Sequence, residues 1–256
     1  MRELKAKAQA CFLNTARNQS LALGGVPARG VTNFKLAMSP ETDVMLGVLD
    51  LTASGPGQIE DILVQGKTLN VTDKPAPIDM FLNTSTNTSE RYLGVTLKGG
   101  LSLSINGALD GAGNVAGSWF IDPVDKAVPY QEQAGFYNYF AGVGTLAIGA
   151  GGEAIMRAVT DRPATLGKLT IVNRSAAVVD TDLFVTSVKI NGVETLSGEQ
   201  DNQEIPLSSF FSNSQAGSGL DLNAKISANQ SIAIKIKNRD AGNAASVMAG
   251  ILCHAY

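Results

Sequence analysis

The chain has 256 residues, of which 44% are hydrophobic and 17% are charged, so it can bury one large core or two of ordinary size and is not a disordered polymer. Its net charge of −3 does not favour nucleic-acid binding, and its two cysteines, Cys11 and Cys253, form no disulfide framework. The 27 glycines favour turns over long helices, which predicts an all-β fold.

The N-terminal segment is basic. Residues 2–19 contain good helix formers and neither glycine nor proline, which predicts a short helix or arm. Residues 1–36 carry six basic residues and one acidic residue, a balance of +5. These cations either face an acidic partner or are ordinary solvated side chains on a short helix.

The first half then shows strand patterns separated by turn residues. Apolar residues alternate with polar ones over residues 34–38, 93–97 and 101–105, and residues 43–52 are nearly continuously apolar. Residues 101–121 predict a hairpin, two strands around a turn at Ala112-Gly113-Asn114.

A connecting segment follows over residues 126–152. Residues 134–152 carry no charge, a length near that of a membrane-spanning helix, but their glycines favour a buried connection instead. We expect the aromatic residues of this segment to pack between domains or between subunits: Tyr130, Phe136, Tyr137, Tyr139 and Phe140.

The second half repeats the first at an offset of 129 residues. Pro77 matches Pro206, Phe81 matches Phe210, and Ala112-Gly113-Asn114 matches Ala241-Gly242-Asn243. The apolar phase agrees throughout, and this phase decides which face of a strand is buried. The match predicts a tandem duplication of one β unit.

The predicted fold is therefore all-β, with two tandem eight-stranded jelly-roll β-sandwiches and a short N-terminal helix. The expected divisions are a basic arm over residues 1–30, a first jelly roll over 31–125, the connection over 126–152 and a second jelly roll over 153–256. An Asn191-Gly192 pair predicts a further hairpin in the second half.

No catalytic pattern is visible, so we expect no enzyme activity. The one histidine, His254, lies near the C-terminus, and the HExxH, GxSxG and P-loop motifs are missing. Clustered loop acids are either solvated or ligands of a structural calcium ion: Asp122, Asp125, Glu199, Asp201 and Glu204. Asn-x-Ser/Thr sequences, such as the one at Asn70, indicate polar loops.

The basic arm at Arg2, Lys5 and Lys7, together with the repeated β unit, resembles one family: the double-jelly-roll major capsid proteins of tailless icosahedral viruses with an internal membrane. The small size is most similar to the corticovirus type of marine bacteriophage. The resemblance implies homotrimers, pseudo-hexagonal capsomers that form an icosahedral shell over the viral lipid, with Arg2, Lys5 and Lys7 facing that membrane.

The same resemblance implies a place in the virion capsid after assembly in the host cytoplasm. Its partners are then other copies of the chain, neighbouring capsomers, membrane lipid and minor capsid proteins, with no direct contact to nucleic acid. Calcium is the one ion that the family suggests, and no cofactor is expected.

A second function stays open at this point. Tandem β-sandwiches also bind carbohydrate, and Trp119 with the aromatic residues of the connecting segment can supply sugar-stacking platforms. Trp119 is otherwise expected in the core, between two sheets. A glycan-cleaving jelly roll is the third alternative, but no pair of acids stands out for it.

Overall fold

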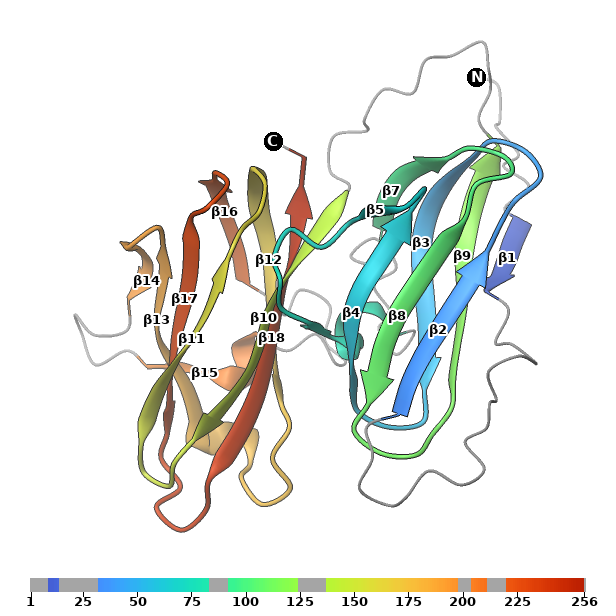
Figure 1. Cartoon of the computed structure of the whole chain (residues 1–256). Coiled ribbons are helices and arrows are strands. Elements are labelled where there is room, and N and C mark those ends of the chain that lie inside the picture. Colours follow the sequence, from blue (N-terminus) through green and yellow to red (C-terminus); the bar gives the residue numbers. More distant parts are fainter. Residues whose placement is uncertain are drawn as a thin grey trace, which may run out of the picture.

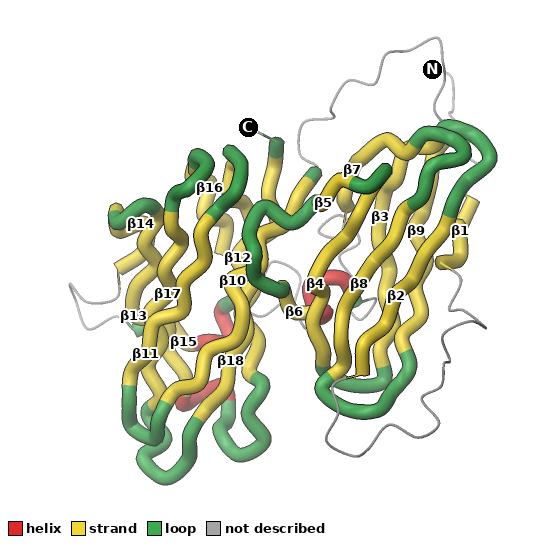
Figure 2. Tube along the Cα trace, in the orientation of Figure 1, coloured by secondary structure: helices red, strands yellow, loops and turns green. Residues whose placement is uncertain are grey.

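The computed structural model describes residues 9–13, 32–82, 92–123, 137–197, 204–210 and 220–255. Within these ranges the protein is built from β-strands and short 3-10 turns, arranged as two β-sandwiches that lie side by side (Figures 1 and 2). No helix in this part of the chain is long and apolar enough to cross a membrane.

The first sandwich has two antiparallel sheets, in the strand orders β1-β9-β3-β7 and β2-β8-β4-β5, with β6 also pairing with β4. Its elements are β1 (Gln9–Leu13), β2 (Thr32–Met38), β3 (Val44–Ala53), β4 (Gly57–Val64), β5 (Lys67–Thr68), β6 (Ala76–Pro77), η1 (Ile78–Phe81), β7 (Tyr92–Leu97), β8 (Leu103–Leu109) and β9 (Val115–Pro123).

The second sandwich has the sheets β10-β18-β12-β16 and β11-β17-β13-β14, with β15 also pairing with β13. Its elements are β10 (Tyr139–Ile148), β11 (Glu153–Val159), β12 (Ala164–Asn173), η3 (Asp180–Asp182), β13 (Leu183–Ile190), β14 (Val193–Ser197), β15 (Ile205–Pro206), η4 (Leu207–Ser209), β16 (Leu220–Ile226), β17 (Ser231–Asn238) and β18 (Ala245–His254).

The two sandwiches share one topology. With the two-residue strands β6 and β15 set aside, each sandwich has eight described strands in chain order, and each forms the sheets 1-8-3-6 and 2-7-4-5. This crossed order, in which successive strands alternate between sheets except for the fourth and fifth, is that of a jelly roll. The predicted tandem jelly rolls are confirmed, and β6–η1 and β15–η4 occupy matching positions 129 residues apart.

The cores follow from the period-two pattern of the strands. In β17 the side chains of Ile232, Ile234 and Ile236 are fully buried, while the residues between them are half-buried. Strand β18 is buried along nearly its whole length, because one face lies on its own core and the other faces the first sandwich. Trp119 is fully buried in the first core, as expected.

The predicted hairpin over residues 101–121 is wrong. β8 and β9 lie in different sheets, since β8 pairs with β2 and β4 whereas β9 pairs with β1 and β3. The turn residue Asn114 instead bonds Ser54, at the end of β3. A turn between sheets needs the same glycine and asparagine as a hairpin turn, so the pattern does not separate them.

The hairpin predicted at Asn191-Gly192 does form, between β13 and β14. Both residues have positive φ, 50° and 78°, as a two-residue turn between twisted strands requires. Gln65 and Gly66 adopt the same geometry between β4 and β5, at φ 54° and 76°. The two halves therefore share this hairpin as well as the jelly-roll order.

Two expected boundaries differ from the structure. The helix predicted over residues 2–19 is replaced at Gln9–Leu13 by β1, which pairs with β9 and completes a sheet of the first sandwich. Sheet pairing here outweighs local helix propensity. The expected connection over residues 126–152 contains β10, so residues 139–148 belong to the second sandwich.

Candidate functional site at the junction between the two sandwiches

The two hydrophobic cores exchange side chains across the junction. Phe140 and Leu252, from the second sandwich, are buried in the core of the first, and Phe140 meets Phe81 edge to face with ring centroids 5.6 Å apart. In return Val71, from the loop before β6, is fully buried in the core of the second sandwich. Each core is therefore completed by the other half of the chain.

The backbone also crosses the junction. Residues 69–75 run along β10: Phe140 N donates to Leu69 O at 3.1 Å, and Val71 N donates back to Phe140 O at 2.8 Å. Further along, Asp161 N donates to Val71 O at 2.9 Å. The first sandwich thus adds a short extended segment to the edge of the second, which covers backbone groups that an edge strand would expose.

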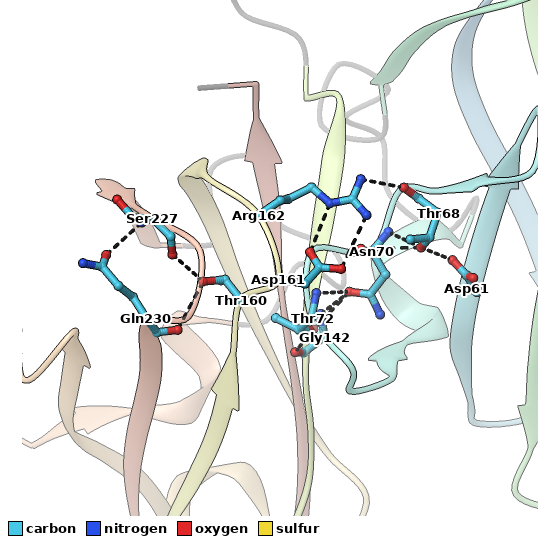
Figure 3. A network of polar contacts seen from close by, with 10 residues as sticks. All are labelled: Asp61, Thr68, Asn70, Thr72, Gly142, Thr160, Asp161, Arg162, Ser227 and Gln230. Atoms are coloured by element: carbon cyan, nitrogen blue, oxygen red, sulfur yellow. Dashed lines mark hydrogen bonds and ion pairs between the residues drawn. The ribbon is translucent and has the colours of Figure 1, made fainter.

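Asn70 is the polar centre of this junction (Figure 3). It is only 4% exposed, and its Oδ1 accepts from the backbone N–H groups of Thr72 and Gly142, each at 3.2 Å. Its Nδ2 donates to Lys74 O at 2.8 Å. A buried amide whose groups are satisfied on several sides holds its surroundings in one arrangement.

Two neighbours complete the network. Thr72 Oγ1 donates to Gly142 O at 2.7 Å. Gly142 itself allows the two segments to meet, because a Cβ at this position would clash with Lys74 O and the carbonyl carbon of Pro75. Figure 3 shows Asn70, Thr72 and Gly142 gathered at the junction, with Arg162 bonded to Thr68 beside them.

Two arginines tie the sandwiches together by charge-assisted bonds. Arg174 Nη2 lies 2.5 Å from Asp79 Oδ2 and 2.7 Å from Gly57 O, and only 9% of its side chain is exposed. Arg162 Nη1 donates to Thr68 O at 3.0 Å, and its guanidinium lies over the ring of Tyr139. Both contacts join residues more than 90 positions apart in the chain.

The aromatic residues expected at an interface fall mainly at this junction. Phe140 is buried there, and Tyr137 and Tyr139 are half-buried against the first core. Tyr137 also stacks on His254, with centroids 4.5 Å apart, which gives the one histidine a packing contact. Tyr130 and Phe136 lie outside the described residues.

Most of the remaining candidate residues lie in segments that the structure does not describe. Arg2, Lys5 and Lys7 lie outside the described residues, as do Asp125, Glu199 and Asp201. Asp122 is placed by its backbone in β9. No group of three metal-ligating side chains occurs in the part of the chain that is described, and the buried Trp119 offers no sugar platform.

Glu204, one of the predicted calcium ligands, is held by cations. Its Oε1 accepts from Lys237 Nζ at 2.8 Å, and Arg239 contacts its Oε2. The hydrogen bond from Lys237 and the positive charges lower the pKa of Glu204 below the ordinary 4.5, against the opposing effect of burial. Glu204 comes just before β15, and its two cationic partners lie in β17 and directly after it. Oε2 is buried and accepts no hydrogen bond from the described part of the chain, so its contact with Arg239 is an ion pair.

Sequence reasoning missed Asn70, Arg174 and Arg162. Asn70 drew notice only as part of an Asn-x-Thr sequence, which indicated a polar loop, but the structure buries it. Leu69-Asn70-Val71 alternates as a strand with one buried face does, so the local pattern predicts an exposed Asn70 and gives no signal of its burial. No pattern in the sequence pairs Arg174 with Asp79.

Comparison with known proteins does not assign the chain to a family. No protein-family model matches the chain, and no curated protein matches it. Among solved structures the chain is similar to PNGF-II in two crystal forms, P21 and C2, at 10% identity and TM-scores of 0.36 and 0.37. The match covers 88% of this chain and 60% of PNGF-II, so the chain spans less than two thirds of that protein. TM-scores this low carry no functional argument.

The junction predicts a large effect for Asn70→Ala. The variant leaves buried N–H groups of Thr72 and Gly142 without acceptors, at about 1–3 kcal/mol for each group, so we expect a loss of about 3 kcal/mol in the free energy of unfolding. Urea denaturation followed by fluorescence of the single tryptophan measures it. Asn33→Ala, at an exposed position of β2, is the control, with a change within about 0.5 kcal/mol. A loss below about 1 kcal/mol for Asn70→Ala would contradict the central role of this amide.

The ion pairs of Glu204 predict a pH dependence. Because the native pKa is lowered, the pairs stabilise the fold above pH 4.5, and this contribution disappears as pH falls through the native pKa. Glu204→Gln should therefore be less stable than the parent at pH 7, and the gap should close below pH 4.5. Thermal melts across this range test it, with the exposed Glu41→Gln as control. A gap that stays constant down to acid pH contradicts the assignment.

Proposed function

We propose that this chain is the major capsid protein of an icosahedral virus with an internal membrane, and that it assembles head to tail into pseudo-hexagonal trimers. The observation that supports the proposal most is a difference in burial between two matching elements of the repeat, β6–η1 and β15–η4. The first element is covered by the second sandwich of the same chain, and its counterpart is exposed.

The covered element is β6–η1 of the first sandwich. Ala76 and Pro77 are buried and Met80 is 5% exposed, because β10 and β18 of the second sandwich pack on them. Gly250 of β18 leaves room for this contact, since a Cβ there would clash with Met80 Sδ. The β6–η1 element is therefore buried by another part of the same chain.

The exposed element is β15–η4 of the second sandwich. Pro206, Ser208 and Ser209 occupy the positions that match Pro77, Asp79 and Met80, and all three are exposed. Leu207 and Phe210 are buried in their own core, as Ile78 and Phe81 are in theirs. The element is folded alike in both halves, but within the described residues no sheet covers it in the second.

The first sandwich supplies a sheet of the matching kind. β1 pairs antiparallel with β9, as β10 pairs with β18, and the two pairs hold the same place in their four-stranded sheets. One copy can thus offer its β1-β9 sheet to the β15–η4 element of the next. Such a contact joins different surfaces, and it forms a closed ring when the rotation between copies matches.

Three copies would place six jelly rolls around one axis, which is the pseudo-hexagonal capsomer that the resemblance implies. The basic residues Arg2, Lys5 and Lys7 would then contact anionic lipid of the internal membrane. Neighbouring capsomers and minor capsid proteins are the remaining partners, and the virion capsid is the location. The jelly-roll pair supplies structure in this role and carries no reaction.

Ser208→Arg should break the trimer. The variant places a long charged side chain on the exposed surface of η4, where the next copy would pack, but leaves the core untouched. We expect the parent to sediment at three times 26.7 kDa and the variant to dissociate at concentrations at least tenfold higher. Thr195→Arg, on exposed β14, is the control and should stay trimeric. An intact trimer in Ser208→Arg rules out this surface.

Neutralising the arm should weaken membrane binding. Each basic residue near an anionic surface contributes about 1 kcal/mol, so Arg2→Gln, Lys5→Gln and Lys7→Gln together should lower affinity about 100-fold. Co-sedimentation with vesicles containing phosphatidylserine measures this, with neutral vesicles as control. Unchanged binding of the triple variant means that the arm does not face lipid.

A further inference from the structure

The outer face of β11 carries an exposed patch of unusual composition. Ile155, Arg157 and Val159 point away from the core, while Met156 and Ala158, between them, point inward. Ile155 is 46% exposed and Val159 is 50% exposed. We call these three outward residues the β11 patch. Exposed β-branched side chains on both sides of an arginine make this a candidate contact surface.

Arg157 differs from the other described arginines. Arg162 pairs with Asp161, Arg174 with Asp79 and Arg239 with Glu204. Arg157 has neither an ion pair nor a hydrogen bond with any residue in the described part of the chain. A guanidinium with five donors is thus left available beside two aliphatic side chains.

The surface is hollowed on both sides of Arg157. One hollow of about 220 Å³ lies between β11, β17 and β13, and another of about 470 Å³ lies between the end of β11 and residues 72–74. Arg157 lines both. The two hollows therefore meet at Arg157, on the edge strand β11 of its sheet.

The nearby cations are already committed. Lys189 pairs with Glu194 at 3.3 Å, and Lys235 pairs with Glu153 at 3.0 Å. In the larger hollow Lys74 pairs with Asp73 at 3.6 Å, and Asp161 pairs with Arg162 at 3.0 Å. A polyanion such as nucleic acid needs several free cations. A sugar needs an aromatic platform, and no aromatic residue lines either hollow. The patch instead presents one free positive charge between two apolar contacts.

We propose that the β11 patch docks an extended segment of a companion polypeptide that carries a carboxylate between apolar side chains. The carboxylate would take a bidentate bond from Arg157, and the flanking side chains would cover Ile155 and Val159. Arginine with well-packed neighbours is a frequent centre of binding energy at protein interfaces. This proposal does not depend on the trimer, because the patch lies on β11 and not on β15–η4.

The test uses the whole chain and a labelled nine-residue peptide in which valine alternates with aspartate and glutamate. Fluorescence anisotropy should show binding, and a matched peptide with asparagine and glutamine in place of the acids should bind at least tenfold more weakly. Arg157→Gln should weaken binding of the acidic peptide at least tenfold. Adding Ile155→Ser to that variant should weaken binding further. Binding should also fall at 0.5 M salt because the contact is exposed and charged.

The control variant is Lys67→Glu, which changes an exposed cation on β5 of the first sandwich and should bind the acidic peptide as the parent does. Circular dichroism confirms that each variant is folded. Absence of binding, or equal binding by Arg157→Gln and the parent, overturns the proposal. If Arg157→Gln instead lowers the mass of the protein alone in solution, the patch joins copies of this chain and the companion segment is wrong.

Discussion

The exchange of core side chains between the two sandwiches is the contact on which the rest of the structure depends. Phe140 and Leu252 complete the first core, and Val71 completes the second. Neither sandwich can move away without exposing a fully buried aromatic or aliphatic residue, at about 1.5–3 kcal/mol for each large side chain. The exchange therefore fixes the angle between the jelly rolls.

Polar contacts make that angle specific. Apolar contacts alone would let one sandwich slide over the other, because they have no preferred direction. Hydrogen bonds do have one: Asn70 accepts from Gly142 and donates to Lys74, and Arg174 donates to Asp79 and to the carbonyl of Gly57. The close approach at Gly142 leaves no room for a side chain between the two segments. A fixed angle between two like units is what a closed ring requires, because a variable angle would give open chains or mixed sizes. The junction thus connects the fold of one chain to the proposed assembly of several.

The sequence allowed the architecture to be predicted but not the junction. The repeat at offset 129 and the period-two pattern identified two jelly rolls, since buried faces and turn residues leave local signals. The pairing of β8 and β9 was predicted wrongly, because turn residues do not report whether the next strand stays in the same sheet. β1 was predicted as helix, since its strand conformation depends on pairing with β9, about 110 positions away.

The contacts at the junction had no local signal for the same reason. Asn70 and Gly142 are 72 positions apart, and Arg174 and Asp79 are 95 apart. Each residue type is ordinary for a loop or turn, and only the fold brings them within bonding distance. Phe140 was expected at an interface because it belongs to an uncharged aromatic segment, which is a pattern that can be read locally.

The most direct test of the account is electron microscopy of the purified protein, with its mass measured on the same sample by light scattering. The account predicts a single particle of three times 26.7 kDa, whose averaged image shows six sandwiches around one axis. A stable monomer at high concentration, or an open chain of copies, would contradict the claim that the exposed β15–η4 element is an assembly surface.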